Sequence, residues 1–324
     1  MTGSKYAYAF GRIKALEVGL IDASQLKRMI DARTAQDAVK IVAETPYGSY
    51  LSENPDIPDI ERAILQELER TYQIIAKISP DKAITDLLQL KYDIHNLKII
   101  LKSQITGHDL SHLLVPLGRE GPVALRAACD GDMKAVSPEI AHVIQKSLSL
   151  YQESGDFQKV QFFLDREHSR LLSEGLATTP FLQKYSAYAV DLENIRNFIR
   201  AEKMGIKFAE VFLSGGTLAL ASFSEIKDQA ADYFMESTRN SDFASVVHEG
   251  LTAYQETGSL ARYETLVDNF LMEYMKKAKT YSLSLEPVIG YLFAKEREAK
   301  VVRQILISKM KGIEVTGRVS DVYE

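Results

Sequence analysis

Apolar residues recur every three or four positions along most of the chain, which is the spacing of one buried face of an amphipathic helix. One such stripe consists of Ile60, Ile64, Leu68, Tyr72 and Ile75. Alternating apolar and polar positions, which are typical of half-buried strands, are scarce. The pattern therefore predicts an all-α protein.

Residues that start and stop helices support this prediction. Pro58 stands just inside the start of the stripe, where its fixed φ suits a first helical turn. Ser79-Pro80 ends the stripe, and Asp81 opens the next helix. Thr34 followed by Asp37 has the spacing of a capping box and predicts another helix start.

One apolar seam is repeated along the chain. Its first copy is Leu87, Leu90, Ile94, Leu97 and Leu101. A shift of 98 positions gives Tyr185, Tyr188, Leu192, Ile195 and Ile199. The same shift places Asp93, Asn96 and Lys98 on Asp191, Asn194 and Arg196. Agreement at eight positions with one offset indicates an internal duplication.

A third, weaker copy lies 107 positions further on. Its seam is Leu292, Lys295, Ala299, Val302 and Leu306. Glu298 and Arg303 keep the acid and the base, whereas Val301 replaces the asparagine. We therefore predict three related helical units, residues 1–105, 106–205 and 206–324, which close around a pseudo-threefold axis rather than forming a solenoid of short repeats.

The acid and the base of each copy flank its apolar seam. Acids and bases at such flanking positions can pair between neighbouring helices. A cyclic pattern would join Asp93 to Arg196, Asp191 to Arg303 and Glu298 to Lys98. Local pairing, or solvation around an open funnel, is the alternative that the sequence leaves open.

Composition excludes several classes of protein. The 324 residues are 46% hydrophobic and 26% charged, as in soluble globular proteins. The net charge of −5 argues against nucleic-acid binding, because such a field repels phosphate backbones. No stretch approaches the roughly 20 apolar residues of a membrane-spanning helix. The lone Cys129 is expected to be a buried thiol.

Motifs of catalysis are missing from the sequence. Residues 213–217, Leu-Ser-Gly-Gly-Thr, lack the lysine of a phosphate-binding loop and predict a turn between helices. His108 and His112 have the spacing of a metal-binding pair, but they lack further ligands. Glu296 and Glu298 lie on different helix faces, which is poor geometry for paired carboxylates. We therefore predict no enzyme activity, no cofactor and no metal.

Four segments resemble the C-type rotor protein of V/A-type rotary ATPases, called d in eukaryotes. They are residues 6–15, 92–98 (Tyr-Asp-Ile-His-Asn-Leu-Lys), 191–196 (Asp-Leu-Glu-Asn-Ile-Arg) and 287–309. The resemblance covers nearly the whole chain. The chain departs from the pattern at Val301 and in its modest final segment, residues 317–324.

This resemblance implies a funnel of three helical units that couples the central shaft, made of D- and F-type subunits, to the proteolipid rotor ring. Such a protein transmits torque for proton or sodium transport without binding nucleotide. It would be cytoplasmic and would meet the membrane only through the ring. The expected binding residues are the polar groups beside the three repeated seams: Asp93, Asn96, Lys98, Asp191, Asn194, Arg196, Glu298 and Arg303.

Two other functions are compatible with the composition. One is a helical protein-interaction scaffold outside the ATPase, although the length of the repeat favours a closed socket. The other is an all-α enzyme that uses His108, His112 or nearby acids, which a metal analysis and a hydrolase panel would test.

Overall fold

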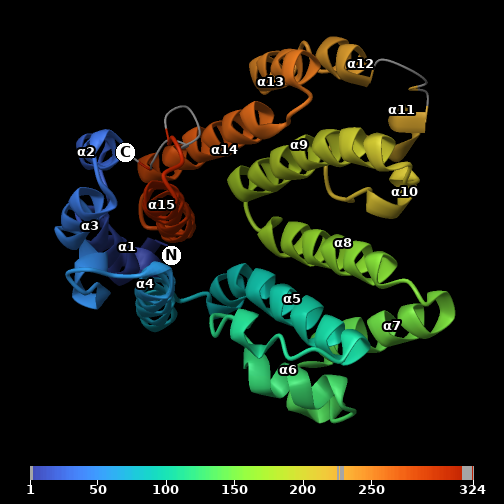
Figure 1. Cartoon of the computed structure of the whole chain (residues 1–324), viewed down its shortest axis with the longest axis horizontal. Helices are drawn as coiled ribbons and strands as arrows, with labels where there is room; N and C mark the ends of the chain where they lie inside the picture. Colours follow the sequence, from blue (N-terminus) through green and yellow to red (C-terminus); the bar gives the residue numbers. More distant parts are fainter. Residues whose placement is uncertain (1–2, 225, 227–229, 316–322, 324) are drawn as a thin grey trace. The chain divides into compact units, whose positions relative to one another are not determined.

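The structure is a computed structural model, and it describes residues 3–224, 226, 230–315 and 323. Every regular element among these residues is an α-helix or a short 3-10 helix, which confirms the all-α prediction (Figure 1). The described residues fall into two compact units, Met1–Thr85 with Met235–Glu324, and Asp86–Phe234. The division into three units and the funnel around a pseudo-threefold axis remain predictions. Apart from Tyr323, the final segment lies outside the described residues.

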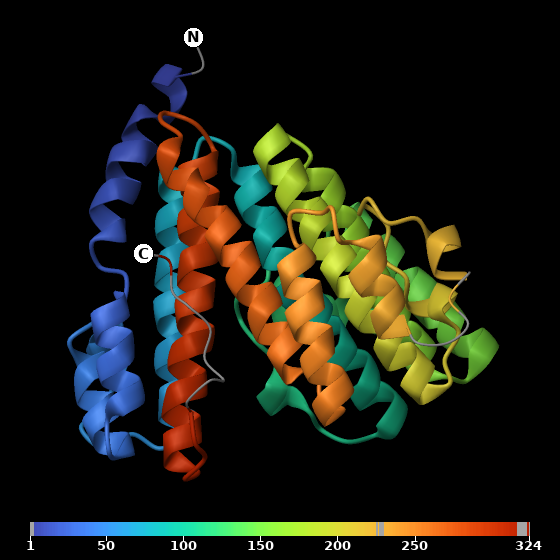
Figure 2. The same cartoon turned by 90° about the horizontal axis from the view of Figure 1, so that it is seen from above.

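Unit 1 joins segments from the beginning and the end of the sequence. Its elements are α1 (Gly3–Glu17), α2 (Ala23–Asp31), α3 (Ala35–Ala43), η1 (Pro46–Tyr50), α4 (Ile57–Ile78), α13 (Ala244–Thr257), α14 (Ala261–Lys276), η4 (Lys277–Thr280) and α15 (Glu286–Met310). Helix α15 packs against α1, α3, α4 and α14. Figure 2 shows α4 and α15 running side by side, with α1, α2 and α3 beyond them. Helix α15 is therefore the central element of this unit.

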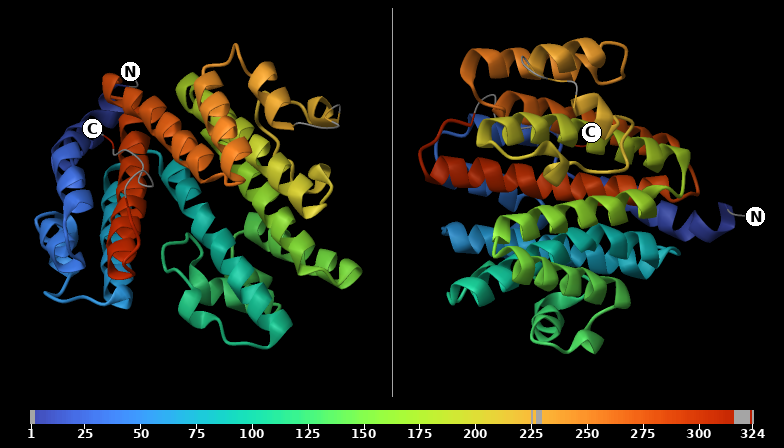
Figure 3. Two further views of the ribbon diagram at one scale, coloured as in Figure 1. Left: turned by 45° about the horizontal axis from the view of Figure 1, so that its top comes forward. Right: turned by 90° about the vertical axis from the view of Figure 1, so that its right-hand side faces the viewer.

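Unit 2 is a continuous stretch of chain. Its elements are α5 (Lys82–Thr106, which begins before the boundary), η2 (Ser111–Leu113), α6 (Gly121–Cys129), η3 (Met133–Ala135), α7 (Pro138–Ser154), α8 (Phe157–Leu176), α9 (Pro180–Met204), α10 (Phe208–Val211), α11 (Leu220–Ser224) and α12 (Ala230–Ser237, which ends after the boundary). Helix α8 packs against both α7 and α9, and Figure 3 shows these long helices in successive layers. Residues from α5, α6, α7 and α8, including Leu97, Leu125, Ile144 and Leu164, share one core.

The predicted helix boundaries are confirmed. Helix α4 begins at Ile57 with a proline in its first turn, and it ends at Ile78 before Ser79. Thr34 caps α3 by accepting a hydrogen bond from the Asp37 amide. The predicted stripe of α4 is buried along its whole length. No helix in the described ranges is long and apolar enough to cross a bilayer.

The three repeated seams lie on the three helices of 25 residues, α5, α9 and α15, which we call the anchor helices. All fifteen seam positions are buried except Leu87, which packs at the edge of the core. Lys295 is buried together with its apolar neighbours. Such a residue requires polar partners inside the protein, because burying an unpaired charge is costly.

Candidate functional site

The polar residues of α5 hold the chain that follows this helix. Asn96 is buried and makes two hydrogen bonds with Val115, 19 residues later: its Nδ2 donates to the Val115 oxygen and its Oδ1 accepts from the Val115 amide, both at 2.8 Å. Asp93 is also buried and accepts from the amides of Arg119 and Glu120, both at 3.1 Å. A side-chain amide matches both backbone groups of one residue, as a carboxylate cannot.

Helix α9 repeats these contacts. Asn194 donates to the Leu213 oxygen and accepts from its amide, again at 2.8 Å and 19 residues away. Asp191 accepts from the amides of Thr217 at 2.8 Å and Leu218 at 2.9 Å, and from the Thr217 hydroxyl at 2.6 Å. The sequence separations of the amide contacts, 26 and 27 residues, are those found around Asp93. The offset of 98 therefore reflects a repeated structure.

We call the buried acid and asparagine of each helix, together with the backbone groups that they bind, an anchor. In the anchors of α5 and α9 a glycine allows the backbone to approach the acid. A Cβ atom at Gly118 would lie 2.1 Å from Asp93 Oδ1, and one at Gly216 would lie 2.1 Å from Asp191 Oδ1. Real Cβ atoms do not approach an oxygen so closely. Glycine is therefore required at both positions for the backbone to reach the carboxylate.

The acid of α15 has the same kind of partner, but from the opposite end of the chain. Glu298 is buried and accepts from the Ile21 amide at 2.6 Å, across 277 residues. Val301, which replaces the asparagine, is buried among apolar residues and has no side-chain polar group to offer. The third anchor therefore consists of the acid alone.

All three acids bind amides that lie just before a helix. Glu120 precedes α6, Leu218 lies two residues before α11 and Ile21 two residues before α2. A carboxylate at this place accepts hydrogen bonds from free amides and lies near the positive end of the helix dipole. At the other end of α2, Lys309 donates to the oxygens of Ile30 at 2.8 Å and Ala32 at 2.6 Å. Helix α15 thus holds both ends of α2.

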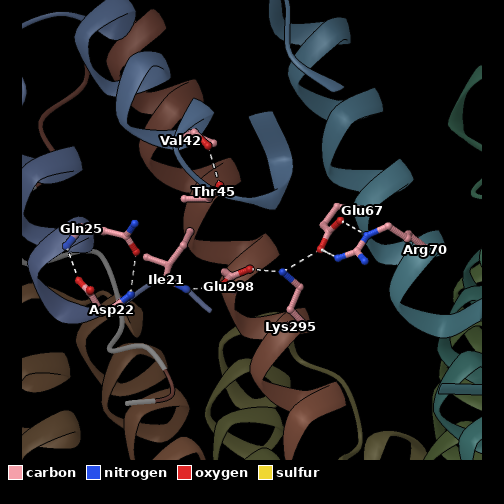
Figure 4. A network of polar contacts seen from close by, with 9 residues as sticks. All are labelled: Ile21, Asp22, Gln25, Val42, Thr45, Glu67, Arg70, Lys295 and Glu298. Atoms are coloured by element: carbon pink, nitrogen blue, oxygen red, sulfur yellow. Dashed lines mark hydrogen bonds and ion pairs between the residues drawn. The ribbon is translucent and has the colours of Figure 1, made fainter. Parts of the chain in front are cut away.

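A buried chain of ion pairs extends from Glu298 into α4 (Figure 4). Lys295 Nζ contacts Glu298 one turn away and lies 3.0 Å from Glu67 Oε1. Arg70 donates to both oxygens of Glu67, at 2.7 and 2.8 Å. Two acids and two bases therefore alternate: Glu67, Lys295 and Glu298 are buried and compensate one another, and Arg70 at the end of the chain is partly exposed. Breaking such a buried pair leaves an uncompensated charge.

Burial and hydrogen bonds set the protonation of these groups. Burial raises the pKa of Asp93 to about 6, although the amides of Glu120 and Arg119 favour its charged form. Burial also disfavours the charged form of Glu67, but Arg70 and Lys295 outweigh it and hold the pKa of Glu67 below its usual value. Lys295 Nζ lies over the Tyr47 ring, 4.8 Å from its centroid, which further stabilises the buried cation.

The three bases of the anchor helices lie nearer the surface and have acid partners within their own units. Lys98 pairs with Asp165 of α8, and Arg196 pairs with Glu193 on its own helix. Arg303 donates from Nε to both oxygens of Glu61, at 2.9 and 2.8 Å. Each base therefore has an acid partner within its own unit, as in the local alternative, and the cyclic pattern remains a prediction.

Comparison with known proteins covers almost the whole chain. The profile of the ATP synthase (C/AC39) subunit family matches residues 9–316, which include all three anchor helices and the Ile21 contact. The chain belongs to this family. The resemblance noted in the sequence is thereby confirmed.

Individual members of the C/AC39 family are distant in sequence but similar in extent. The C subunit of the A-type ATP synthase of Methanocaldococcus jannaschii is 24% identical, with 95% of this chain and 84% of the relative aligned. The C subunit of the V-type sodium ATPase of Enterococcus hirae is 25% identical, with 92% of each chain aligned. The C subunit of the A-type ATP synthase of Haloquadratum walsbyi is 24% identical, with 97% and 96% aligned.

The eight residues expected to bind partners fall into two groups in this family member. The acids and asparagines, Asp93, Asn96, Asp191, Asn194 and Glu298, are buried and bind their own backbone. Lys98, Arg196 and Arg303 are partly exposed. A binding role remains a prediction for all eight, and the described contacts give the buried five a structural role.

Other candidate groups lie apart from the anchors. His108 and His112 are exposed in the segment after α5. Cys129 is a free, buried cysteine, as predicted, and burial raises its pKa to about 12. The described part of the chain contains no group of three or more histidine, cysteine or acidic residues that could hold a metal ion.

Proposed function

We propose that this C/AC39 family member is the non-catalytic coupling component of a V/A-type rotary ATPase. It would link the D- and F-type subunits of the central shaft to the proteolipid rotor ring and transmit torque for proton or sodium transport. The observation that carries this proposal is the family match over residues 9–316, together with alignment along most of their length to relatives from A-type and V-type ATPases.

The anchors support the proposal because a coupling component must resist deformation. Each anchor helix fixes a backbone segment by buried hydrogen bonds, and such bonds are costly to break without replacement. The Arg70–Glu67–Lys295–Glu298 chain ties α4 to α15 in the same way. Close-packed interiors with satisfied polar groups transmit strain rather than absorbing it.

Partner binding is assigned to the accessible bases rather than to the buried acids. Lys98, Arg196 and Arg303 make ion pairs in which both side chains are partly exposed. Such pairs contribute only about 0.2 to 1 kcal/mol each, so a partner can displace the local acid at little cost. Acidic groups on the shaft or on the polar loops of the ring fit these three positions.

The same proposal gives the location of the protein. It would be cytoplasmic and peripheral, held at the membrane only through the ring, with no nucleic-acid partner and no nucleotide turnover of its own. A helical scaffold outside the ATPase is the alternative that the experiment must distinguish.

Affinity purification from native membranes tests the proposal. The full chain, tagged and expressed at its native level, should recover shaft and proteolipid subunits in fixed ratios. Recovery of unrelated proteins without any ATPase component would support the scaffold instead. Triple replacement of Lys98, Arg196 and Arg303 by glutamine should reduce recovery, whereas glutamine at the exposed Lys40 and Arg239, which also pair locally, should not.

A further inference from the structure

The chain reverses its direction directly after α15. Gly312 has a φ of +66°, and the Ile313 amide donates to the Ser308 oxygen at 2.8 Å. This left-handed residue with a hydrogen bond back to the last turn is a common helix ending that reverses the chain. Val315, three residues later, is buried. The segment after α15 therefore begins by packing against the protein.

Tyr323, 13 residues after the end of α15, is also buried in unit 1. Lys279 of η4 lies over its ring, with Nζ 4.5 Å from the centroid, and the same Nζ donates to the Tyr323 oxygen at 3.4 Å. A cation over an aromatic ring contributes about 0.5 to 2 kcal/mol, more when it is shielded from solvent. Tyr323 is thus held through both its ring and its backbone.

Gly290 of α15 makes room for the phenol. A Cβ atom at this position would lie 2.7 Å from Tyr323 Oη and 2.8 Å from the Ala278 Cβ. Only glycine leaves this space open between α15 and η4. The phenol of Tyr323 therefore packs closely against α15 at this position.

Glu17 of α1 influences the ionisation of Tyr323. Burial and the nearby charge of Glu17 both raise the pKa of Tyr323. One oxygen of Glu17 accepts from Lys14 at 2.9 Å, whereas the other is buried without a hydrogen-bond partner among the described residues, as is Tyr323 Oη. The ring, and not its hydroxyl, makes the defined contacts.

We infer that Gly290, Ala278 and Lys279 form an intramolecular binding site for the side chain of Tyr323, through which this residue fastens η4 to α15. This site does not depend on the proposed rotor function. It joins η4 and α15 at one aromatic residue, so its occupancy controls how firmly η4 is held against α15.

Chemical labelling of the folded full chain tests whether the site is occupied. Nitration with tetranitromethane, followed by peptide mass spectrometry, compares Tyr323 with Tyr8, which is 68% exposed, and Tyr281, which is 39% exposed. Tyr323 should react at least about tenfold more slowly than Tyr8, because it must first leave its site. Equal rates for Tyr323 and Tyr8 would overturn the inference.

Matched variants test the fastening. Tyr323→Ala should speed hydrogen exchange of the amides in η4, without changing exchange in α7 and α8. Tyr323→Phe keeps the ring and should resemble the wild type. Lys279→Met should increase Tyr323 labelling, whereas Lys277→Met, which removes a cation over Tyr274, should not. Unchanged exchange in Tyr323→Ala, or an equal rise throughout the chain, would contradict the fastening.

Discussion

Asn96 and Val115 exchange two hydrogen bonds of 2.8 Å across 19 residues, and Asn194 and Leu213 do the same at the same distance and separation. The side-chain amide of each asparagine offers one donor and one acceptor to a loop residue, as the backbone of a neighbouring strand would in a sheet. The loop residue lies outside any helix. This device fixes a loop on a helix without further secondary structure.

Replacing either asparagine by aspartate removes the donor and places a carboxylate against a carbonyl oxygen. We expect Asn194→Asp to lower the free energy of unfolding by about 1 to 3 kcal/mol or more, because both backbone groups of Leu213 are buried with it. Denaturant unfolding measures this cost. Asn197→Asp on the same helix is the control, since its single bond to Val211 is 3.4 Å long. Equal costs at the two positions would contradict the anchor.

Replacement of glycine by alanine should have opposite effects on stability inside and outside the anchors. Gly118→Ala and Gly216→Ala should each destabilise the protein, because the added Cβ would meet the anchoring carboxylate at 2.1 Å. Gly11→Ala, on an exposed face of α1 with nothing within 4 Å, should instead stabilise it by about 0.4 to 1 kcal/mol. Thermal unfolding of the three variants tests this ordering, and a stabilising alanine at 118 or 216 would refute the close approach.

The buried lysine predicts a larger loss. Lys295→Met keeps the length of the side chain but leaves Glu67 and Glu298 buried without their shared cation, which should cost about 3 to 5 kcal/mol. Adding Glu298→Gln should recover part of this loss, because glutamine can still accept from the Ile21 amide. Lys300→Met, at an exposed pair with Asp268, should change stability by less than about 0.5 kcal/mol. Similar losses at 295 and 300 would show that the chain of ion pairs is not compensating buried charge.

Much of this arrangement could be predicted from the sequence, and the reasons for the rest are physical. Helical spacing marked the seams, and the offset of 98 paired Asp93 with Asp191 and Asn96 with Asn194. The partners of these side chains could not be predicted, because they are backbone groups, which every residue carries. Gly118 and Gly216 obey the same offset and were the available signal.

The sequence also shows Lys295 as a charged residue in an otherwise apolar seam. It occupies the seam position that Leu90 and Tyr188 fill in the other copies, and a charge at a buried position indicates a buried partner. Glu67 is likewise a charged residue at a buried position, on α4, and it also indicates a buried partner. The Ile21–Glu298 contact spans 277 residues and depends on the chain path, which residue patterns do not specify.

The raised pKa of Asp93 predicts a pH dependence of stability. The carboxyl titrates near 3.8 when unfolded and at about 6 when folded, so between these values the folded state binds more protons. Its contribution to stability is therefore fully present below pH 4 and declines as the pH rises through 6. The unfolding free energy of the wild type minus that of Asp93→Asn should increase by up to about 3 kcal/mol as the pH falls from 7 to 4. A flat or opposite trend would show that the amides of Arg119 and Glu120 keep Asp93 ionised.

Coupling between ATP turnover and ion transport is the central claim, and it can be measured in vesicles that contain the parent ATPase with and without this chain. We predict that removing the chain leaves ATP hydrolysis by the soluble head but abolishes ATP-driven ion transport, and that adding the purified chain restores transport. Transport that continues at the same number of ions per ATP in its absence would contradict a coupling role.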